Sequence, residues 1–239
     1  MTNVALENTN AKSGAPPTTV SEDGYVASET GTEKEKPADG RSNVQGQAFF
    51  NEKPAAGVEV KLCRKFSSIL GCRETQYSTK TDDAGEYLIK DVEPGEYEGL
   101  IVKVFDTPRY VFAARSFGIS AAKYKLEANK TFFAPPSNLF KSDLKVQSPK
   151  AAAKIDQASL DVKWDAYPDA AYYKISFFAK EPKIVSPYIN IKVEDTSFKP
   201  EKPLANGEWR IKIDAFNANE VRLSQLNEDL KFTVSGGAN

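Results

Sequence analysis

The sequence has no histidine, only two cysteines and one methionine, and almost no excess of either charge. Without histidine, a histidine-based catalytic triad, an imidazole metal site and the commonest general base near neutral pH are all excluded. Two cysteines cannot supply the four thiolates of a structural zinc site, nor hold an iron–sulfur cluster alone. These absences exclude most of the familiar catalytic and metal-binding arrangements.

The charge balance argues against a nucleic-acid-binding protein. The 239 residues include 32 Lys and Arg against 33 Asp and Glu, for a formal net charge of −1. A nucleic-acid-binding protein needs a concentrated cationic surface to face the phosphates. No apolar run approaches the ~20 residues that cross a bilayer as a helix. We therefore expect no nucleic-acid partner and no transmembrane segment.

Residues 1–42 differ in composition from the rest of the chain. They are mostly Thr, Ser, Glu, Gly, Asn, Ala and Pro, and their few large apolar residues never recur at helix or strand spacing. Seven acidic and four basic side chains give this stretch a net charge of −3. It has neither the basic start nor the apolar central run of a secretory signal. We predict a disordered acidic leader or linker over residues 1–42.

From residue 43 onwards, short alternating segments are separated by turn residues. Val58, Val60 and Leu62 alternate with charged residues, which is the period of a half-buried strand. Gly85 and Gly95 lie in stretches typical of turns between strands. No helical period of useful length is present. The pattern predicts an antiparallel β-sandwich over residues 43–144.

Four blocks of this first unit resemble a known family. They read VQG at 44–46, AGVEV at 56–60, TDDAGEY at 81–87 and VEPGEY at 92–97. In this order they are similar to a carboxypeptidase regulatory-like domain, which shares a transthyretin-like sandwich and is related to the B-type repeats of collagen adhesins. The resemblance implies a non-catalytic stabilising, spacer or recognition module, usually in exported proteins.

Two sharper interpretations of this unit can be weighed. Asp82, Asp83 and Glu86 have the oxygen ligands that Ca²⁺ prefers, but Asp before Gly is ordinary turn chemistry, and we expect a turn with no bound metal. The resemblance to adhesin repeats also implies a Lys–Asn isopeptide bond, for which Lys61 is the nearest candidate. Lys61 falls on the polar side of its strand, so we expect no such bond.

Cys63 and Cys72 bracket a short loop that ends in a glycine. Two strands that meet at the base of such a loop would bring the thiols close enough for a disulfide. We favour this bridge, which fits an exported protein, over two structural thiols, which would fit a cytosolic one. Redox chemistry is the third alternative, and the absence of a histidine that could activate either thiol weakens it.

The pattern restarts after residue 144. Seven short strands with an early tryptophan resemble a fibronectin type III-like domain over residues 145–239. Trp164 matches the family's strand-B tryptophan, Tyr173 the strand-C tyrosine, and Trp209 lies near the tyrosine-corner position. An indole has no hydroxyl, so we expect the hydrogen bond of the corner to be lost or re-routed.

Aromatic residues also suggest a platform for sugar rings. Trp164 and Trp209 lie on the inward side of their strands, so we expect them in the core. The candidates for exposed ligand-contacting residues are therefore four tyrosines, namely Tyr110, Tyr167, Tyr172 and Tyr188.

The chain thus predicts an all-β protein with two tandem antiparallel β-sandwiches after a disordered N-terminal segment. P-loop, Rossmann glycine and nucleophile-elbow motifs are missing, and no pair of acids faces across an aromatic cleft. We therefore expect no cofactor, no catalytic residue and no enzyme.

The favoured function is adhesion, scaffolding or spacing in an exported or cell-surface protein with a protein or polysaccharide partner. The alternative is a carbohydrate-binding accessory protein, and a third is a subunit whose sheet edges another chain covers. The expected location is extracellular, periplasmic or at the cell surface.

Overall fold

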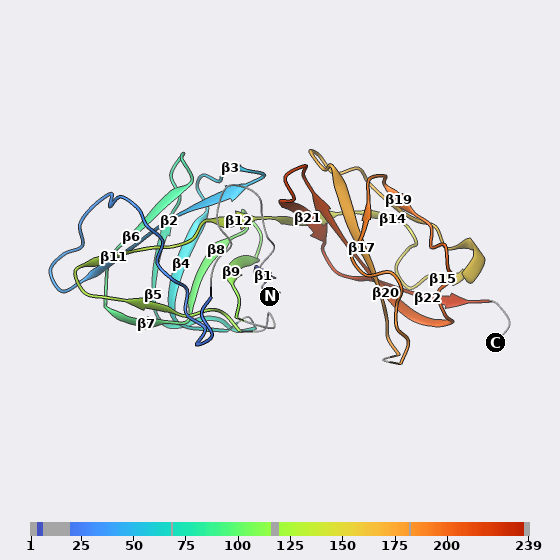
Figure 1. Ribbon diagram of the computed structural model, residues 1–239, viewed down its shortest axis with the longest axis horizontal. Coiled ribbons are helices and arrows are strands. Elements are labelled where there is room, and N and C mark those ends of the chain that lie inside the picture. Colours follow the sequence, from blue (N-terminus) through green and yellow to red (C-terminus); the bar gives the residue numbers. More distant parts are fainter. Residues whose placement is uncertain (1–3, 7–19, 68, 116–119, 182, 237–239) are drawn as a thin grey trace. The chain divides into compact units, whose positions relative to one another are not determined.

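The computed structural model (Figure 1) describes residues 4–6, 20–67, 69–115, 120–181 and 183–236, and nearly all its regular structure is β-strand. The chain divides into two compact units, Met1–Leu139 and Phe140–Asn239, so the division lies slightly earlier than the predicted residue 144. The all-β fold class is confirmed. Several short strands pair in parallel with a neighbour, which the prediction of purely antiparallel sandwiches did not include.

Unit 1 contains two main sheets and a short two-stranded one. One sheet has the order β1-β9-β8-β4-β5, and the other has β2 at its centre, paired with β3, β6, β11 and β12, while β7 pairs with β10. The strands are β1 Val4–Leu6, β2 Ser42–Phe50, β3 Lys53–Pro54, β4 Glu59–Ser67, β5 Gly71–Lys80, β6 Glu86–Val92, β7 Gly95–Tyr97, β8 Gly99–Lys103, β9 Tyr110–Ala113, β10 Tyr124–Leu126, β11 Lys130–Phe133 and β12 Ser137–Leu139.

The core of unit 1 follows from the alternation along its strands. Val60 and Leu62 of β4 are fully buried, as are Val102 of β8 and Val44 of β2. Full burial of one such side chain contributes roughly 1.5–3 kcal/mol. The register Val60↔Val102 places these two side chains on the same face, which is the face that the sequence pattern predicted.

A second, smaller apolar cluster lies on the opposite face of the same sheet. Cys63, Ile101 and Phe112 form it, with Phe66 among the partly buried side chains that pack against them. Cys63 is joined to Cys72 by a disulfide that connects β4 to β5, and their Cα atoms are 5.4 Å apart, within the usual range for a bridge. The disulfide therefore also helps to cover the outer face of the sheet.

Residues 20–42 lie along unit 1 instead of forming a free linker. Glu29 donates its backbone N–H to Phe133 O (2.8 Å), and Gly40 donates its own to Asn129 Oδ1 (2.7 Å). The Gln45 side chain, on β2, donates to Thr32 O and accepts from the Lys34 N–H. The predicted disordered stretch therefore does not include residues 20–42, nor Val4–Leu6, which pairs with β9. Residues 1–3 and 7–19 of that prediction lie outside the described residues.

Unit 2 is a second β-sandwich, built from two sheets. Its smaller sheet has the order β14-β16-β19, and its larger sheet has the order β13-β21-β20-β17-β18, with β22 paired to β20 and β15 paired to β22. The elements are β13 Lys141–Leu144, β14 Val146–Ser148, β15 Lys154–Asp156, the 3₁₀ turn Gln157–Ser159, β16 Val162–Trp164, β17 Tyr172–Ala179, β18 Ile191–Val193, β19 Ser197–Phe198, β20 Gly207–Phe216, β21 Arg222–Leu226 and β22 Leu230–Ser235.

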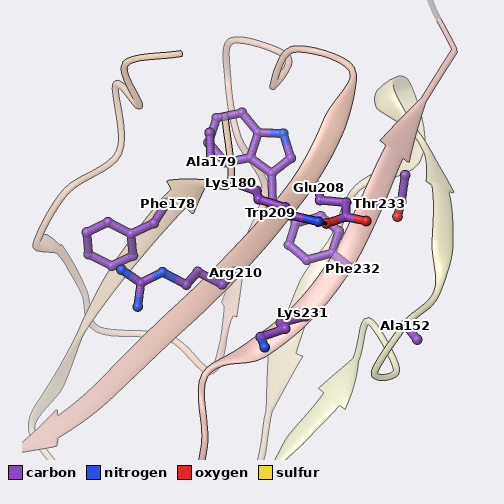
Figure 2. A pocket seen from close by; sticks show the side chains of 10 residues that line it. All are labelled: Ala152, Phe178, Ala179, Lys180, Glu208, Trp209, Arg210, Lys231, Phe232 and Thr233. Carbon is purple, nitrogen blue, oxygen red and sulfur yellow. Dashed lines mark ion pairs between the residues drawn. The ribbon is translucent and has the colours of Figure 1, made fainter. Parts of the chain in front are cut away.

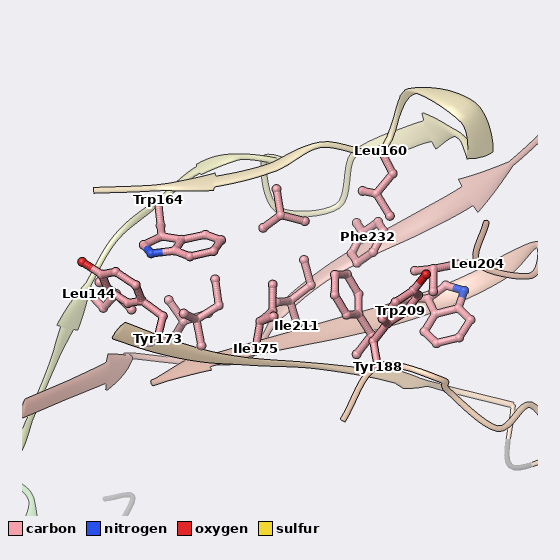
Figure 3. Close-up of a cluster of buried hydrophobic side chains, with 14 of the residues drawn as sticks. Leu144, Leu160, Trp164, Tyr173, Ile175, Tyr188, Leu204, Trp209, Ile211 and Phe232 are labelled. Atoms are coloured by element: carbon pink, nitrogen blue, oxygen red, sulfur yellow. The ribbon is translucent and has the colours of Figure 1, made fainter. Parts of the chain in front are cut away.

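Large aromatic and aliphatic side chains fill the space between these two sheets (Figure 3). Trp164 reaches from β16 toward Tyr173 of β17, with ring centroids 5.3 Å apart in an edge-on arrangement. Ile175 and Ile211 lie beside them and are fully buried. Trp164 and Trp209 are each 2% exposed, which confirms the prediction that both belong to the core.

The corner of unit 2 keeps a hydrogen bond in spite of its tryptophan. The indole Nε1–H of Trp209 donates to Ala205 O at 2.8 Å, four residues upstream. Of the two expected outcomes, loss or re-routing, the structure shows the second, because the indole N–H donates to a backbone carbonyl in place of a tyrosine hydroxyl. The Trp164 indole differs, since its buried N–H has no hydrogen-bond partner among the described residues.

The difference between the two indoles gives a matched test. Trp209→Phe and Trp164→Phe remove the same atoms from the core, but only the first breaks a hydrogen bond. We expect Trp209→Phe to lower the free energy of unfolding of unit 2 by about 1 kcal/mol more than Trp164→Phe, as measured by urea denaturation. Trp209→Tyr should recover part of this difference. An equal loss in the two phenylalanine variants would contradict a stabilising corner bond.

The disulfide gives a second test. Closing the ten-residue loop should stabilise unit 1 by about 2.5–3 kcal/mol through the lost entropy of the unfolded chain. The double variant Cys63→Ala/Cys72→Ala should therefore unfold at lower urea concentration, and a reducing agent should lower the midpoint of the unaltered protein to a similar extent. A midpoint that does not change on reduction would contradict the bridge.

Candidate functional site

Two of the four tyrosines proposed as ligand contacts are not exposed. Tyr172 is 5% exposed and Tyr188 is 9% exposed. The Tyr172 ring stacks on Phe216, with centroids 5.2 Å apart. The Tyr188 hydroxyl accepts from the Lys202 N–H and donates to the Lys202 carbonyl oxygen. The expectation that both rings present a free face is therefore wrong.

The other two tyrosines are half-buried and lie in different units. Tyr110 of unit 1 packs against the cluster around Cys63, and the Lys61 ammonium lies 5.7 Å from its ring centroid. Tyr167 of unit 2 lies near Asp143; its burial, followed by the negative charge of Asp143, raises the pKa of the Tyr167 hydroxyl to about 12. Both tyrosines have intramolecular partners that account for their positions.

The acidic turn after β5 has the hydrogen bonds of a turn. The Asp82 carboxylate accepts from the backbone N–H groups of Ala84 (3.0 Å) and Glu86 (2.9 Å). The Lys34 ammonium lies 2.8 Å from Asp82 Oδ2 and 2.6 Å from Glu86 Oε2. A lysine of the N-terminal stretch thus occupies the position that a bound cation would take. Across the described ranges, no cluster of three potential metal ligands was found.

Lys61 also has a simple electrostatic partner. Its ammonium lies 3.3 Å from Glu59 Oε2 on the same strand. The side chain shares the outer face of β4 with Cys63, in agreement with the expected polar side of this strand.

The best candidate for a binding site is a groove of about 510 Å³ in unit 2 (Figure 2). It lies on the outer face of the larger sheet, where β17, β20 and β22 run side by side. The residues that line it are Ala152, Phe178, Ala179, Lys180, Glu208, Trp209, Arg210, Lys231, Phe232 and Thr233. Trp209 and Phe232 belong to the core and close the groove from beneath.

The strand register arranges the outward side chains in two rows across the sheet. Phe178 pairs with Arg210, and Arg210 pairs with Lys231, which forms the first row. The Arg210 guanidinium lies 4.4 Å from the centroid of the Phe178 ring. Figure 2 shows these two side chains next to each other, with Lys231 on the neighbouring strand. An aromatic ring and two cations therefore line one side of the groove.

The second row mixes charges with a hydroxyl. Lys180 lies beside Glu208, with their charged atoms 2.5 Å apart, and Glu208 pairs across the sheet with Thr233. In the first row, Arg210 forms an ion pair with Asp229. Lys231 differs from the other two cations, because within the described part of the chain no carboxylate or hydrogen-bond acceptor contacts its ammonium. The groove thus contains one cation without a counter-charge.

Sequence reasoning placed Trp209 on the inward side of its strand, which leaves its neighbour Arg210 outward, but it did not find the groove. The pattern along β20 shows which side chains point outward, but it does not show which residues of β17 and β22 lie opposite them. This register appears only once the strands pair, and it brings Phe178 and Lys231 beside Arg210.

Comparisons with known proteins give only distant similarities. No family model matches the chain, and no curated protein matches it. Among solved structures, it is similar to the FN1–FN3 domains of chicken CNTN1, at 15% identity over 84% of this chain and 69% of that chain, with a TM-score of 0.29. The fibronectin(III)-like modules of Clostridium thermocellum CbhA align at 12% identity over 84% and 92%, with a TM-score of 0.31. A streptococcal ancillary pilin aligns at 13% identity over 83% and 60%, with a TM-score of 0.28.

All three TM-scores are low, so the description of unit 2 as a β-sandwich rests on its own sheets. Within the described ranges, no helix is long and apolar enough to cross a membrane.

The contact between Lys34 and Asp82 gives a test that depends on pH. Hydrogen bonds from Lys34 and from the Glu86 N–H hold the pKa of Asp82 below its usual value. The stabilising contribution of this carboxylate is therefore complete above the unfolded pKa of about 3.9, and it is lost as the pH falls through the lower folded value. We expect amide hydrogens of residues 29–41 to lose protection from exchange on acidification through this range.

Lys34→Met should accelerate the same exchange at neutral pH, because it removes the ammonium and keeps most of the apolar stem. Lys36→Met is the matched control, because the exposed Lys36 has no ion pair among the described residues. Equal exchange in the two variants would show that the ion pair does not hold residues 29–41 against unit 1.

Proposed function

We propose that this protein is a non-enzymatic module of an exported or cell-surface protein, with a role in adhesion, scaffolding or spacing. The observation that carries the proposal is the disulfide between Cys63 and Cys72, which lies within an apolar cluster of unit 1. Disulfides persist in oxidising compartments and are rare in the cytosol. Two sandwich units in succession provide loops and faces for a partner.

The directions of the pKa shifts support a non-enzymatic role. Burial raises the pKa of the Tyr87 and Tyr124 hydroxyls, and hydrogen bonds to Asp82 and Glu86 raise the pKa of Lys34. A hydrogen bond from Lys130 lowers the pKa of Glu127. Each of these shifts leads away from neutral pH, whereas an acid–base catalyst needs a pKa close to the working pH.

Carbohydrate binding is the second candidate, and the groove of unit 2 favours it more than the four tyrosines do. Phe178 provides an apolar ring at the surface, and the rows around it contain donors and acceptors suited to sugar hydroxyls. In this form of the proposal the module attaches its parent protein to a polysaccharide.

The location can be tested on intact cells of the source organism. Under the proposal, a reagent that cannot cross membranes should label the chain at its exposed lysines. Alkylation of these cells before lysis, followed by denaturation, should detect no free thiol on Cys63 or Cys72. Recovery of the chain only from the cytosol, with both thiols free, would refute the proposal.

A further inference from the structure

The first row of the groove places two like charges directly opposite each other. Arg210 of β20 and Lys231 of β22 are cross-strand partners on the same face of the sheet. Like charges at directly opposed positions destabilise a sheet. Asp229 offsets the charge of Arg210, but Lys231 has no such partner among the described residues. The arrangement costs stability in the free protein and would be relieved by an anion in the groove.

The rest of the lining narrows the chemistry of that anion. The Lys180–Glu208 pair offers an ammonium donor and a carboxylate acceptor side by side, and Thr233 adds a hydroxyl next to them. Such mixed groups suit the hydroxyls of a sugar. An acidic peptide such as polyglutamate would supply the negative charge, but it has no hydroxyls for these mixed groups to bind. A neutral polysaccharide would leave Lys231 without a counter-charge.

The aromatic side chain of the first row adds an apolar contact to the charge and the hydrogen-bonding groups. The Phe178 ring is half-buried and is the aromatic side chain of the outward row. The apolar side of a sugar ring can pack against it, while a carboxylate on the same sugar reaches Lys231. The two side chains are separated by one strand, β20.

We propose that this groove binds an acidic polysaccharide, through a uronic acid whose carboxylate pairs with Lys231 and whose ring packs beside Phe178. The inference rests on the proposed role as a surface-binding module, and it adds the ligand class and the residues. Lys231 supplies the charge, Phe178 the apolar contact, and Lys180, Glu208 and Thr233 the hydrogen bonds to hydroxyls.

Binding of the full chain to polygalacturonate tests the proposal. The matched probe is the same polymer as its methyl ester, which keeps the sugar ring and the hydroxyls but removes the negative charge. In affinity electrophoresis or calorimetry we expect the acid form to bind at least about tenfold more tightly than the ester. No binding of the acid form, or equal binding of the two forms, would overturn the proposal.

Variants locate the binding to the groove. Lys231→Glu should reduce affinity at least about tenfold while leaving the free protein as stable or more stable, since the new carboxylate faces Arg210. Phe178→Ala should weaken binding more than Phe178→Leu. Lys163→Glu is the control, because Lys163 is an exposed lysine on the other sheet. If Lys163→Glu weakens binding as much as Lys231→Glu, the attraction is general and the groove is not the site.

Polyglutamate separates the two classes of acidic polymer. Polyglutamate that binds as tightly as polygalacturonate, with the binding lost in Lys231→Glu, would show that the ligand is an acidic peptide and would overturn the assignment.

These outcomes are independent of the location of the protein. An exported, disulfide-bonded chain that ignores polygalacturonate refutes only the ligand, whereas a cytosolic chain with free thiols refutes the proposed function even if the groove binds sugar acids.

Discussion

The alternation of side chains along β20 is the constraint on which unit 2 depends. Trp209, Ile211 and Ile213 point into the core, while Glu208 and Arg210 point outward. The strand pairs with β17 on one side and with β21 and β22 on the other, so its register positions both neighbours. A slip by one residue would bury the charged row and expose the tryptophan. The register of β20 therefore determines the core, the corner hydrogen bond of Trp209 and the groove together.

The same strand shows where the surface departs from what stability alone would favour. Glu208 faces Lys180, which is a favourable pair, but Arg210 faces Lys231, which is not. Departures of this kind from local consistency are expected at functional sites, where stability is exchanged for binding. In unit 1, by contrast, the acidic turn has a counter-charge, since the Lys34 ammonium lies within ion-pair distance of both Asp82 and Glu86.

Strand pattern and core were predictable from sequence because period-two alternation directly reports which side chains are buried. Trp164 and Trp209 were placed correctly for this reason. The contacts of residues 20–42 were not predictable, because they use backbone groups and polar side chains such as Gln45, which leave no apolar period. The exposure of Tyr172 was predicted wrongly because its outward ring is covered by stacking on Phe216. The groove was missed because the sequence of one strand does not show which residues of the neighbouring strands lie opposite it.

The most direct test of the account is to map a uronic acid oligomer onto the full, isotopically labelled chain by amide chemical shifts. On titration with trigalacturonate, we expect the largest changes at residues 178–180, 208–210 and 231–233, on three neighbouring strands of the larger sheet of unit 2. Changes centred on the sheet formed by β14, β16 and β19 or on unit 1, or no changes at all, would contradict the account.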